Sequence, residues 1–282
     1  MNNKRVEKSK LFAFWSDYKI DPRYFLLLFL FSFFTVGQVY LGFFQTWDAL
    51  VISVSATTIT ELIWVKVLYK KWSFPLSAVI TGIGVSLLLS SHVLWAYALT
   101  ACLSISFKFI IRYKGAHVFN PNNLALVVML VLLPDYAVST PKQWTNGIGI
   151  MLCIMLLGLF VAYMANRLET VLTFLFSFTA FGLARHFVFG APLMAALGPL
   201  MGAGLQLFSF YMITDPKTTP GTRKARICFA FLVALIDATF RVNRIPNPQF
   251  YALFIACLLF TVPFRVFMTS KKKKETTLGE GV

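Results

Sequence analysis

The chain has 282 residues, of which 58% are hydrophobic and only 13% charged, and its net charge is +15. Its mean hydropathy of +0.72 is far above that of an average soluble domain, which excludes a soluble globular protein and indicates an integral membrane protein. The sequence contains no Walker loop, GxGxxG or HExxH string, which argues against a nucleotidase or a soluble-type hydrolase.

Ten apolar segments follow one another along the chain. Each is close to the roughly 20 residues that a helix needs to cross a bilayer, and none has the short alternating pattern of membrane-spanning strands. We therefore predict an all-α integral membrane protein with about ten transmembrane helices, at residues 25–45, 48–66, 74–91, 93–111, 118–134, 147–165, 170–187, 192–213, 226–242 and 249–268.

The basic residues predict how these helices cross the membrane. Of the 26 Lys and Arg residues, 22 fall on the side of the two tails, and Lys142, Arg185, Arg241 and Arg244 fall on the other. Because cytoplasmic loops carry the excess of positive charge, we expect both tails, residues 1–24 and 269–282, in the cytoplasm and the protein in the cell (inner) membrane. The net charge then reflects topology and contact with the lipid bilayer, and it requires no nucleic-acid partner.

Two predicted helices begin with the same pair of residues. The fifth opens at Asn120 and Pro121 in "HVFNPNN", and the tenth opens at Asn247 and Pro248 in "RIPNPQF". An Asn side chain can cap a helix, and Pro fits the first turn, where no N–H is needed. The two starts lie five segments apart, so they would enter the bilayer from opposite faces. This is the pattern of an inverted repeat within one transmembrane domain, 25–268, with repeats of about 25–134 and 147–268.

The loop "FYMITDPKTTPGTRKAR", residues 210–226, is unusually polar for a short connection. Asp215, Thr218 and Thr219 are turn-forming and cap-forming residues. The basic residues of the loop are explained by the positive-inside rule alone, but the Thr-Asp-Pro run exceeds what a turn needs. The loop is therefore either a capped turn or part of a binding site.

Ionisable residues inside the predicted helices are further candidates. A carboxyl group within a membrane helix often lies on an ion path, which nominates Glu61, although the nearby Lys66 and the helix end also let it reach the interface. Asp237 and Arg241 lie four residues apart on one helix face and are expected to form a structural ion pair. No metal site is predicted.

Three stretches, "FKFIIRYKGAHVFNPNN", "LLPDYAVSTPKQW" and "YMITDPKTTP", resemble the signatures of the NqrB/RnfD family of membrane electron-transport subunits. The resemblance covers roughly residues 70–270 and is closest to the stand-alone branch that includes UnbU-type proteins of enediyne gene clusters. It implies two inverted five-helix repeats, similar to urea transporters. It also implies a flavin held in the membrane, redox partner subunits, and electron transfer coupled to ion movement.

One departure from the family changes the expected cofactor. Its redox members carry FMN on the last hydroxyl of a Ser/Thr-Gly-Ala-Thr/Ser sequence, and this chain has no such covalent flavinylation motif. The resemblance then implies FMN or riboflavin held noncovalently, by aromatic stacking and helix N-termini. The residues expected at this site are His117, Asn120, Asn122, Asn123, Thr214, Asp215, Thr218, Thr219 and Asn247.

Three functions stay open on the sequence. The first is a redox subunit that binds a flavin, which would make the protein at most one part of an oxidoreductase complex. The second is a small-solute transporter or channel with the same repeats. The third is a membrane scaffold for a biosynthetic or redox assembly. No catalytic residue is predicted.

Overall fold

The computed structural model describes residues 22–40, 46–72, 74–113, 115–139 and 148–267. Most of the predicted tails, 1–24 and 269–282, therefore lies outside the described residues. Within these ranges every one of the ten predicted segments is helical, and the helix ends differ from the predicted ends by a few residues.

The first half of the chain contains five helices and three short strands. The helices are α2 (Pro22–Tyr40), α3 (Trp47–Tyr69), α4 (Leu76–Leu88), α5 (Leu94–Ile110) and α6 (Pro121–Leu132). Strand β2 (Arg112–Tyr113) pairs antiparallel with β3 (Ala116–His117), and β1 (Leu89–Ser90) pairs antiparallel with β4 (Val138–Ser139), which follows α6. These two ribbons hold the ends of α4, α5 and α6 in place.

The second half begins with α7 (Ile148–Met164) and α8 (Leu168–Phe189). The eighth predicted segment is a broken helix, made of α9 (Leu193–Leu197), the 3₁₀ turn η1 (Gly198–Met201), α10 (Ala203–Leu207) and the π-helix η2 (Phe208–Met212). It bends by 57° between Met201 and Gly204. Gly202, at the bend, has an extended backbone. The chain ends with α11 (Arg223–Val242) and with α12 (Pro248–Ala256), which continues through the π-helix η3 (Cys257–Thr261).

Only some of these helices are long and apolar enough to cross a membrane by themselves. Among the described residues, three meet that standard by length and composition, namely Trp47–Tyr69, Leu168–Phe189 and Pro248–Phe267. The bent pair Leu193–Met201 and Gly204–Met212 makes a fourth if it is one span. Shorter apolar helices of 10–17 residues fill most of the rest. The structure therefore supports the coarser prediction, an all-α membrane protein.

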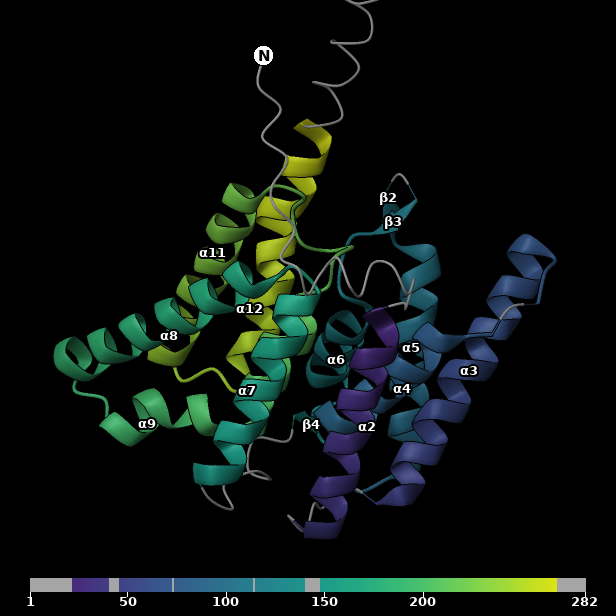
Figure 1. Ribbon diagram of the computed structural model, residues 1–282, viewed down its shortest axis with the longest axis horizontal. Helices are drawn as coiled ribbons and strands as arrows, with labels where there is room; N and C mark the ends of the chain where they lie inside the picture. The colour runs from purple at the N-terminus through teal and green to yellow at the C-terminus, as the bar shows by residue number, and fades with distance from the viewer. Residues whose placement is uncertain (1–21, 41–45, 73, 114, 140–147, 268–282) are drawn as a thin grey trace, which may run out of the picture.

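Two pairs of long helices dominate the packing (Figure 1). Helices α3 and α5 are parallel, because Thr60 donates to Cys102 Sγ at 3.4 Å and, further along both helices, Trp64 Nε1 donates to Ser106 Oγ at 3.4 Å. Helices α8 and α11 are also parallel, because Glu169 pairs with Arg226 near both helix starts and Arg185 lies beside Asp237 near both ends.

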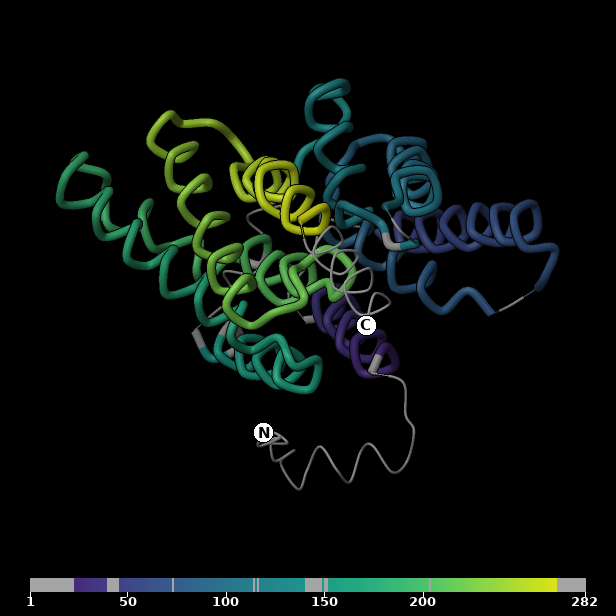
Figure 2. Tube along the Cα trace, turned by 90° about the horizontal axis from the view of Figure 1, so that it is seen from above, coloured from purple at the N-terminus to yellow at the C-terminus, as the bar shows by residue number. Residues whose placement is uncertain are grey.

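The two parallel pairs run in opposite directions. His117, which follows α5, pairs with Asp215, which lies before α11. The end of one pair therefore lies near the start of the other. In Figure 2, α3 and α8 extend to opposite sides of the molecule. Helices α6 and α12 contact each other between the two pairs, and the fully buried side chains of Phe208 and Phe250 lie in this central core.

Candidate functional site

The start of α6 is built as the sequence predicts. Asn120 has an extended backbone, and its Oδ1 accepts a hydrogen bond from the backbone N–H of Asn123 at 3.2 Å. Pro121 occupies the first helical position, where it removes no intrahelical hydrogen bond. Asn122 and Asn123 are each 1% exposed, so the first turn of this short helix carries polar side chains into the protein interior.

Two of the three family-like stretches, "FKFIIRYKGAHVFNPNN" and "YMITDPKTTP", meet at this helix start, and we call these two the signature stretches. Asp215 Oδ2 lies 3.1 Å from His117 Nε2, and Asn120 Nδ2 donates to the same oxygen at 3.5 Å. Asn122 Nδ2 donates to Tyr211 Oη at 2.9 Å. A carboxylate at a helix N-terminus is stabilised by the unpaired N–H groups and the helix dipole. We call the cluster of His117, Asn120, Asn122, Tyr211 and Asp215 the polar junction.

The turn after η2 holds Asp215 through its own backbone. Asp215 Oδ1 accepts from the backbone N–H of Lys217 at 3.0 Å, and the hydroxyls of Thr218 and Thr219 donate to the Asp215 carbonyl at 3.3 and 2.8 Å. Thr214, just after η2, donates to the Phe210 carbonyl of that helix at 2.8 Å. These three Thr hydroxyls therefore fix the turn, and the carboxylate is the group presented to α6. The preceding π-helix is a rare element that often occurs at functional sites.

The two Asn-Pro helix starts also meet, but they are built differently. Asn123 Nδ2 donates to the carbonyl of Phe250, in the first turn of α12, at 3.1 Å. Asn247 lies directly before α12 as predicted, but its φ is +52° and its side chain makes no capping hydrogen bond. The expectation that Asn247 caps its helix like Asn120 is therefore wrong. Asn tolerates the left-handed conformation better than most residues, and the Asn247 backbone turns the chain into α12.

Arg265, near the end of the last helix, completes the junction from the other side. Its Nη1 donates to the His117 carbonyl at 3.0 Å, and its Nη2 donates to the Lys217 carbonyl. One guanidinium thus joins both signature stretches. By sequence alone Arg265 is one of the 22 basic residues predicted on the side of the tails, and Tyr211 is not among the expected site residues. Two signals could have identified these residues: Arg265 is a basic residue at the end of an apolar helix, and Tyr211 is an aromatic residue directly before "MITDP".

Glu61 lies in a separate cluster. Lys108 Nζ donates to Glu61 Oε2 at 2.7 Å and to Ser77 Oγ at 2.7 Å, and Ser77 Oγ donates to Glu61 Oε1 at 2.9 Å. The carboxylate therefore pairs with a lysine of α5 and not with Lys66, and the pair ties α3, α4 and α5 together. A role of Glu61 in an ion path stays a prediction.

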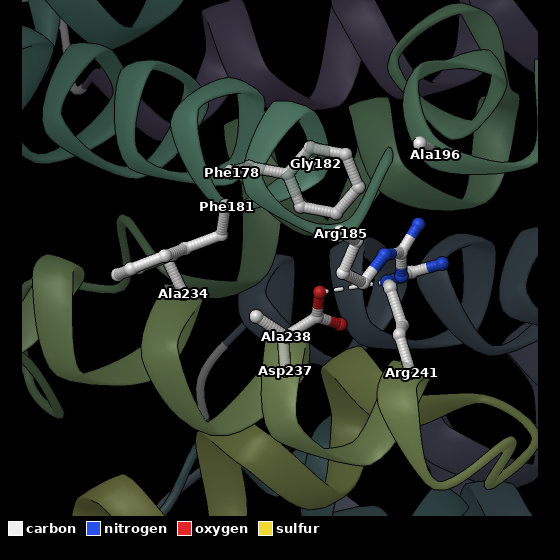
Figure 3. A pocket seen from close by; sticks show the side chains of 9 residues that line it. All are labelled: Phe178, Phe181, Gly182, Arg185, Ala196, Ala234, Asp237, Ala238 and Arg241. Atoms are coloured by element: carbon white, nitrogen blue, oxygen red, sulfur yellow. Dashed lines mark hydrogen bonds and ion pairs between the residues drawn. The ribbon is translucent and has the colours of Figure 1, made fainter. Parts of the chain in front are cut away.

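A second buried ionic cluster lies near the C-terminal ends of both α8 and α11 (Figure 3). Arg241 Nε donates to Asp237 Oδ2 at 2.7 Å, which confirms the predicted pair, and Arg241 also lies over the ring of Phe178 at 4.9 Å. Arg185 of α8 lines the same small pocket and donates to the Ala195 carbonyl at 3.2 Å. Arg241 alone is bonded to the Asp237 carboxylate, and Arg185 lines the same pocket, so the cluster contains one excess positive charge.

Positive charge also gathers around the polar junction. The charge of Lys217 acts on Lys108, and the charge of Asp215, in the junction, acts on Arg265. Burial lowers the pKa of the Arg167 guanidinium below its ordinary value, and the charge of Arg226 acts in the same direction. Among the described residues, several basic side chains predicted on the cytoplasmic side therefore lie near the junction.

Two buried acceptor atoms, one in the polar junction and one on the adjacent Asn123, lack protein partners. Among the described residues, Asn122 Oδ1 and Asn123 Oδ1 accept no hydrogen bond, although both side chains are 1% exposed. Each amide uses its Nδ2 to reach a protein oxygen, so the remaining atom is an acceptor. An unpaired buried acceptor is unfavourable by about 1–3 kcal/mol. These oxygens therefore suit a small cation or a hydrogen-bond donor.

Comparisons with known proteins add no assignment to this site. No protein-family model matches the chain, and no curated protein matches it. The resemblance to NqrB/RnfD subunits accordingly stays a prediction, which rests on sequence stretches that the fold brings into contact through His117 and Asp215.

Proposed function

We propose that the protein is a membrane subunit of the NqrB/RnfD type that takes part in transmembrane electron transport coupled to ion movement. The observation that carries the proposal is the contact between the two signature stretches. They lie 98 residues apart at His117 and Asp215, and these two side chains meet at 3.1 Å. Buried polar groups in a membrane protein usually mark the path of a substrate or an ion.

The proposal includes two inverted five-helix repeats and about ten membrane crossings. In this arrangement α2 to α6 form one repeat, and α7 to the end of the last helix form the other. The parallel pairs α3–α5 and α8–α11 would be equivalent, and their opposite directions support this assignment. The shorter helices would cross the bilayer together with their neighbours. Both tails would be cytoplasmic, on the side where Lys108, Lys217 and Arg265 gather.

The polar junction would serve ion movement. Half-helices that start inside a membrane present N–H groups and unwound backbone to ions and substrates. Here α6 contributes its first turn, and the unpaired Oδ1 atoms of Asn122 and Asn123 are the kind of oxygen ligand that hard cations prefer. Asp215 would supply the charge that balances a bound cation.

The junction does not fit a flavin ring as it is packed. A Cβ atom placed on Gly84 of α4 would lie 2.6 Å from Asn122 Nδ2 and 2.8 Å from a ring carbon of Tyr211. Helices α4 and α6 and the Tyr211 side chain are therefore in direct contact, with no gap for three fused rings. The side chains of the junction could form hydrogen bonds with a flavin, but the packing leaves no room for its ring system. The expected noncovalent FMN or riboflavin consequently rests on the resemblance alone.

A small-solute or ion transporter is the second candidate. The tight packing around Asn122 favours it, because the space beside this side chain suits an ion or a small polar molecule better than a flavin. In that case the repeats would form the path, and redox partner subunits would not be required.

A visible spectrum of the purified protein separates the two candidates. Flavin absorbance that passes into the supernatant after acid precipitation would support noncovalent redox function. A colourless protein that moves ions or solutes in liposomes would support transport and contradict the redox assignment.

Substitutions in the junction test its role in either case. Asp215→Ala and Asn120→Ala should each reduce the measured electron transfer or flux at least tenfold, because they remove the charge and the cap at the start of α6. Lys224→Ala, at an exposed position of α11, is the matched control. Equal activity of all three variants would contradict a functional junction and reduce these residues to helix-end stabilisers.

A further inference from the structure

A cavity of about 470 Å³ lies between α7, α8 and the broken helix α9–η2, apart from the polar junction. This volume falls within the range of small-molecule sites. Its lining is almost entirely apolar and includes Leu172 and Leu175 of α8, Leu197 of α9 and Phe210 of η2. The lining carries no charged side chain, so a charged ligand would lose its hydration without compensation. The cavity therefore suits an uncharged apolar molecule.

One polar residue of the lining carries an atom without a protein partner. The Thr179 hydroxyl donates to the Leu175 carbonyl of its own helix at 2.8 Å and is therefore satisfied. Gln206 is only 3% exposed, and its Nε2 donates to the Leu200 carbonyl at 3.2 Å. Among the described residues, Gln206 Oε1 has no hydrogen-bond partner.

The identity of the free atom determines the chemistry of the ligand. A backbone carbonyl can only accept a hydrogen bond, so the Gln206 atom that faces Leu200 must be the amide nitrogen. The remaining amide atom is an oxygen, which accepts hydrogen bonds. A ligand that satisfies it must donate, and a neutral donor compatible with an apolar cavity is a hydroxyl group.

We propose that this cavity binds an uncharged, membrane-soluble molecule whose apolar body fills the space and whose hydroxyl group donates to Gln206 Oε1. The half-exposed Leu172 and the exposed Phe176 line the site, so the ligand enters from the lipid side. Phe210 lines the cavity while the next residue, Tyr211, contacts Asn122 in the junction. The π-helix η2 thus carries one residue of each site.

A matched pair of probes tests the proposal. The protein in phosphatidylcholine nanodiscs is titrated with tritiated 1-dodecanol, with empty nanodiscs as the background, and unlabelled 1-dodecanol and dodecyl methyl ether are compared as competitors. The two competitors have nearly the same apolar body, and only the alcohol donates a hydrogen bond. We expect saturable binding, with the alcohol competing about tenfold better than the ether.

Two variants assign this preference to the cavity. Gln206→Met keeps the side-chain length and should remove the preference for the alcohol while binding of the ether persists. Leu172→Trp, at a half-exposed lining position, should fill the cavity and reduce binding of both probes with an unchanged melting temperature. Equal competition by alcohol and ether on the wild-type protein, or loss of both probes in Gln206→Met, would overturn the proposal. Absence of saturable binding above the background would do the same.

Discussion

The two halves of the chain both contain a pair of parallel long helices, but they neutralise their buried charges differently. In the first half Glu61 of α3 pairs with Lys108 of α5, so the ion pair joins two helices. In the second half Glu169 of α8 likewise pairs with Arg226 of α11, but Asp237 and Arg241 form a further buried pair on one helix, with Arg185 of α8 as an additional cation beside it. A pair between helices fixes how they slide along each other, whereas a pair within one helix does not. The same packing thus tolerates different chemistry, so equivalent positions of the halves need not carry similar residues.

Removal of Lys108 should have the largest effect on stability. Lys108→Met leaves the Glu61 carboxylate buried with no cation, which should lower the free energy of unfolding by about 3–5 kcal/mol. Reversible unfolding in detergent measures the change. The double variant Glu61→Gln with Lys108→Met removes both charges and should recover most of the loss. A double variant as unstable as the single one would show that the charge pair is not what joins α3 to α5.

The close packing of α4 against α6 and Tyr211 should be the next most sensitive feature. Gly84→Ala places a methyl group against Asn122 and Tyr211, and this overpacking should destabilise the fold by about 1–3 kcal/mol and perturb the polar junction. Gly149→Ala in α7 is the matched control, because no atom lies within 4 Å of its added carbon. The control should be neutral or slightly stabilising, as expected for Ala in a helix. Equal effects would mean that α4 and α6 can separate at little cost.

Removal of Arg185 should lower the free energy of unfolding less than removal of Lys108. Arg185→Met removes one hydrogen bond to the Ala195 carbonyl, while Asp237 keeps Arg241. The expected loss is about 1 kcal/mol in the free energy of unfolding. An effect as large as that of Lys108→Met would indicate that Arg185, and not Arg241, is the partner on which Asp237 depends.

Substitutions at the two Asn-Pro helix starts should cause the smallest changes in stability. Asn120→Ala removes a side-chain cap and should destabilise by about 1 kcal/mol, whereas Asn120→Gly should lose only a few tenths. Asn247→Gly should be neutral or slightly stabilising, because glycine adopts the left-handed conformation at φ +52° without strain. Thermal unfolding of the variants in one detergent measures both effects. A large loss in Asn247→Gly would reveal a side-chain role that the described contacts do not contain.

The parts of the candidate site that sequence reasoning predicted are those set within one helical turn. The cap formed by Asn120 needs only the N–H of Asn123, three residues later, and the Asp237–Arg241 pair needs only helical spacing. The polar character of residues 117–123 and 210–220 was likewise visible, but their mutual contact followed from the family resemblance and not from any local rule.

The sequence by itself determined the class of protein, the ten helical segments and the start of α6, because hydrophobic length, helix propensity and capping depend on neighbouring residues. The tertiary structure alone decided that Glu61 pairs with Lys108, 47 positions away, that Asn247 turns the chain instead of capping a helix, and that Arg265 joins both signature stretches. Those outcomes depend on which helix faces pack together. Many different packings satisfy the same local pattern, so the pattern cannot select among them.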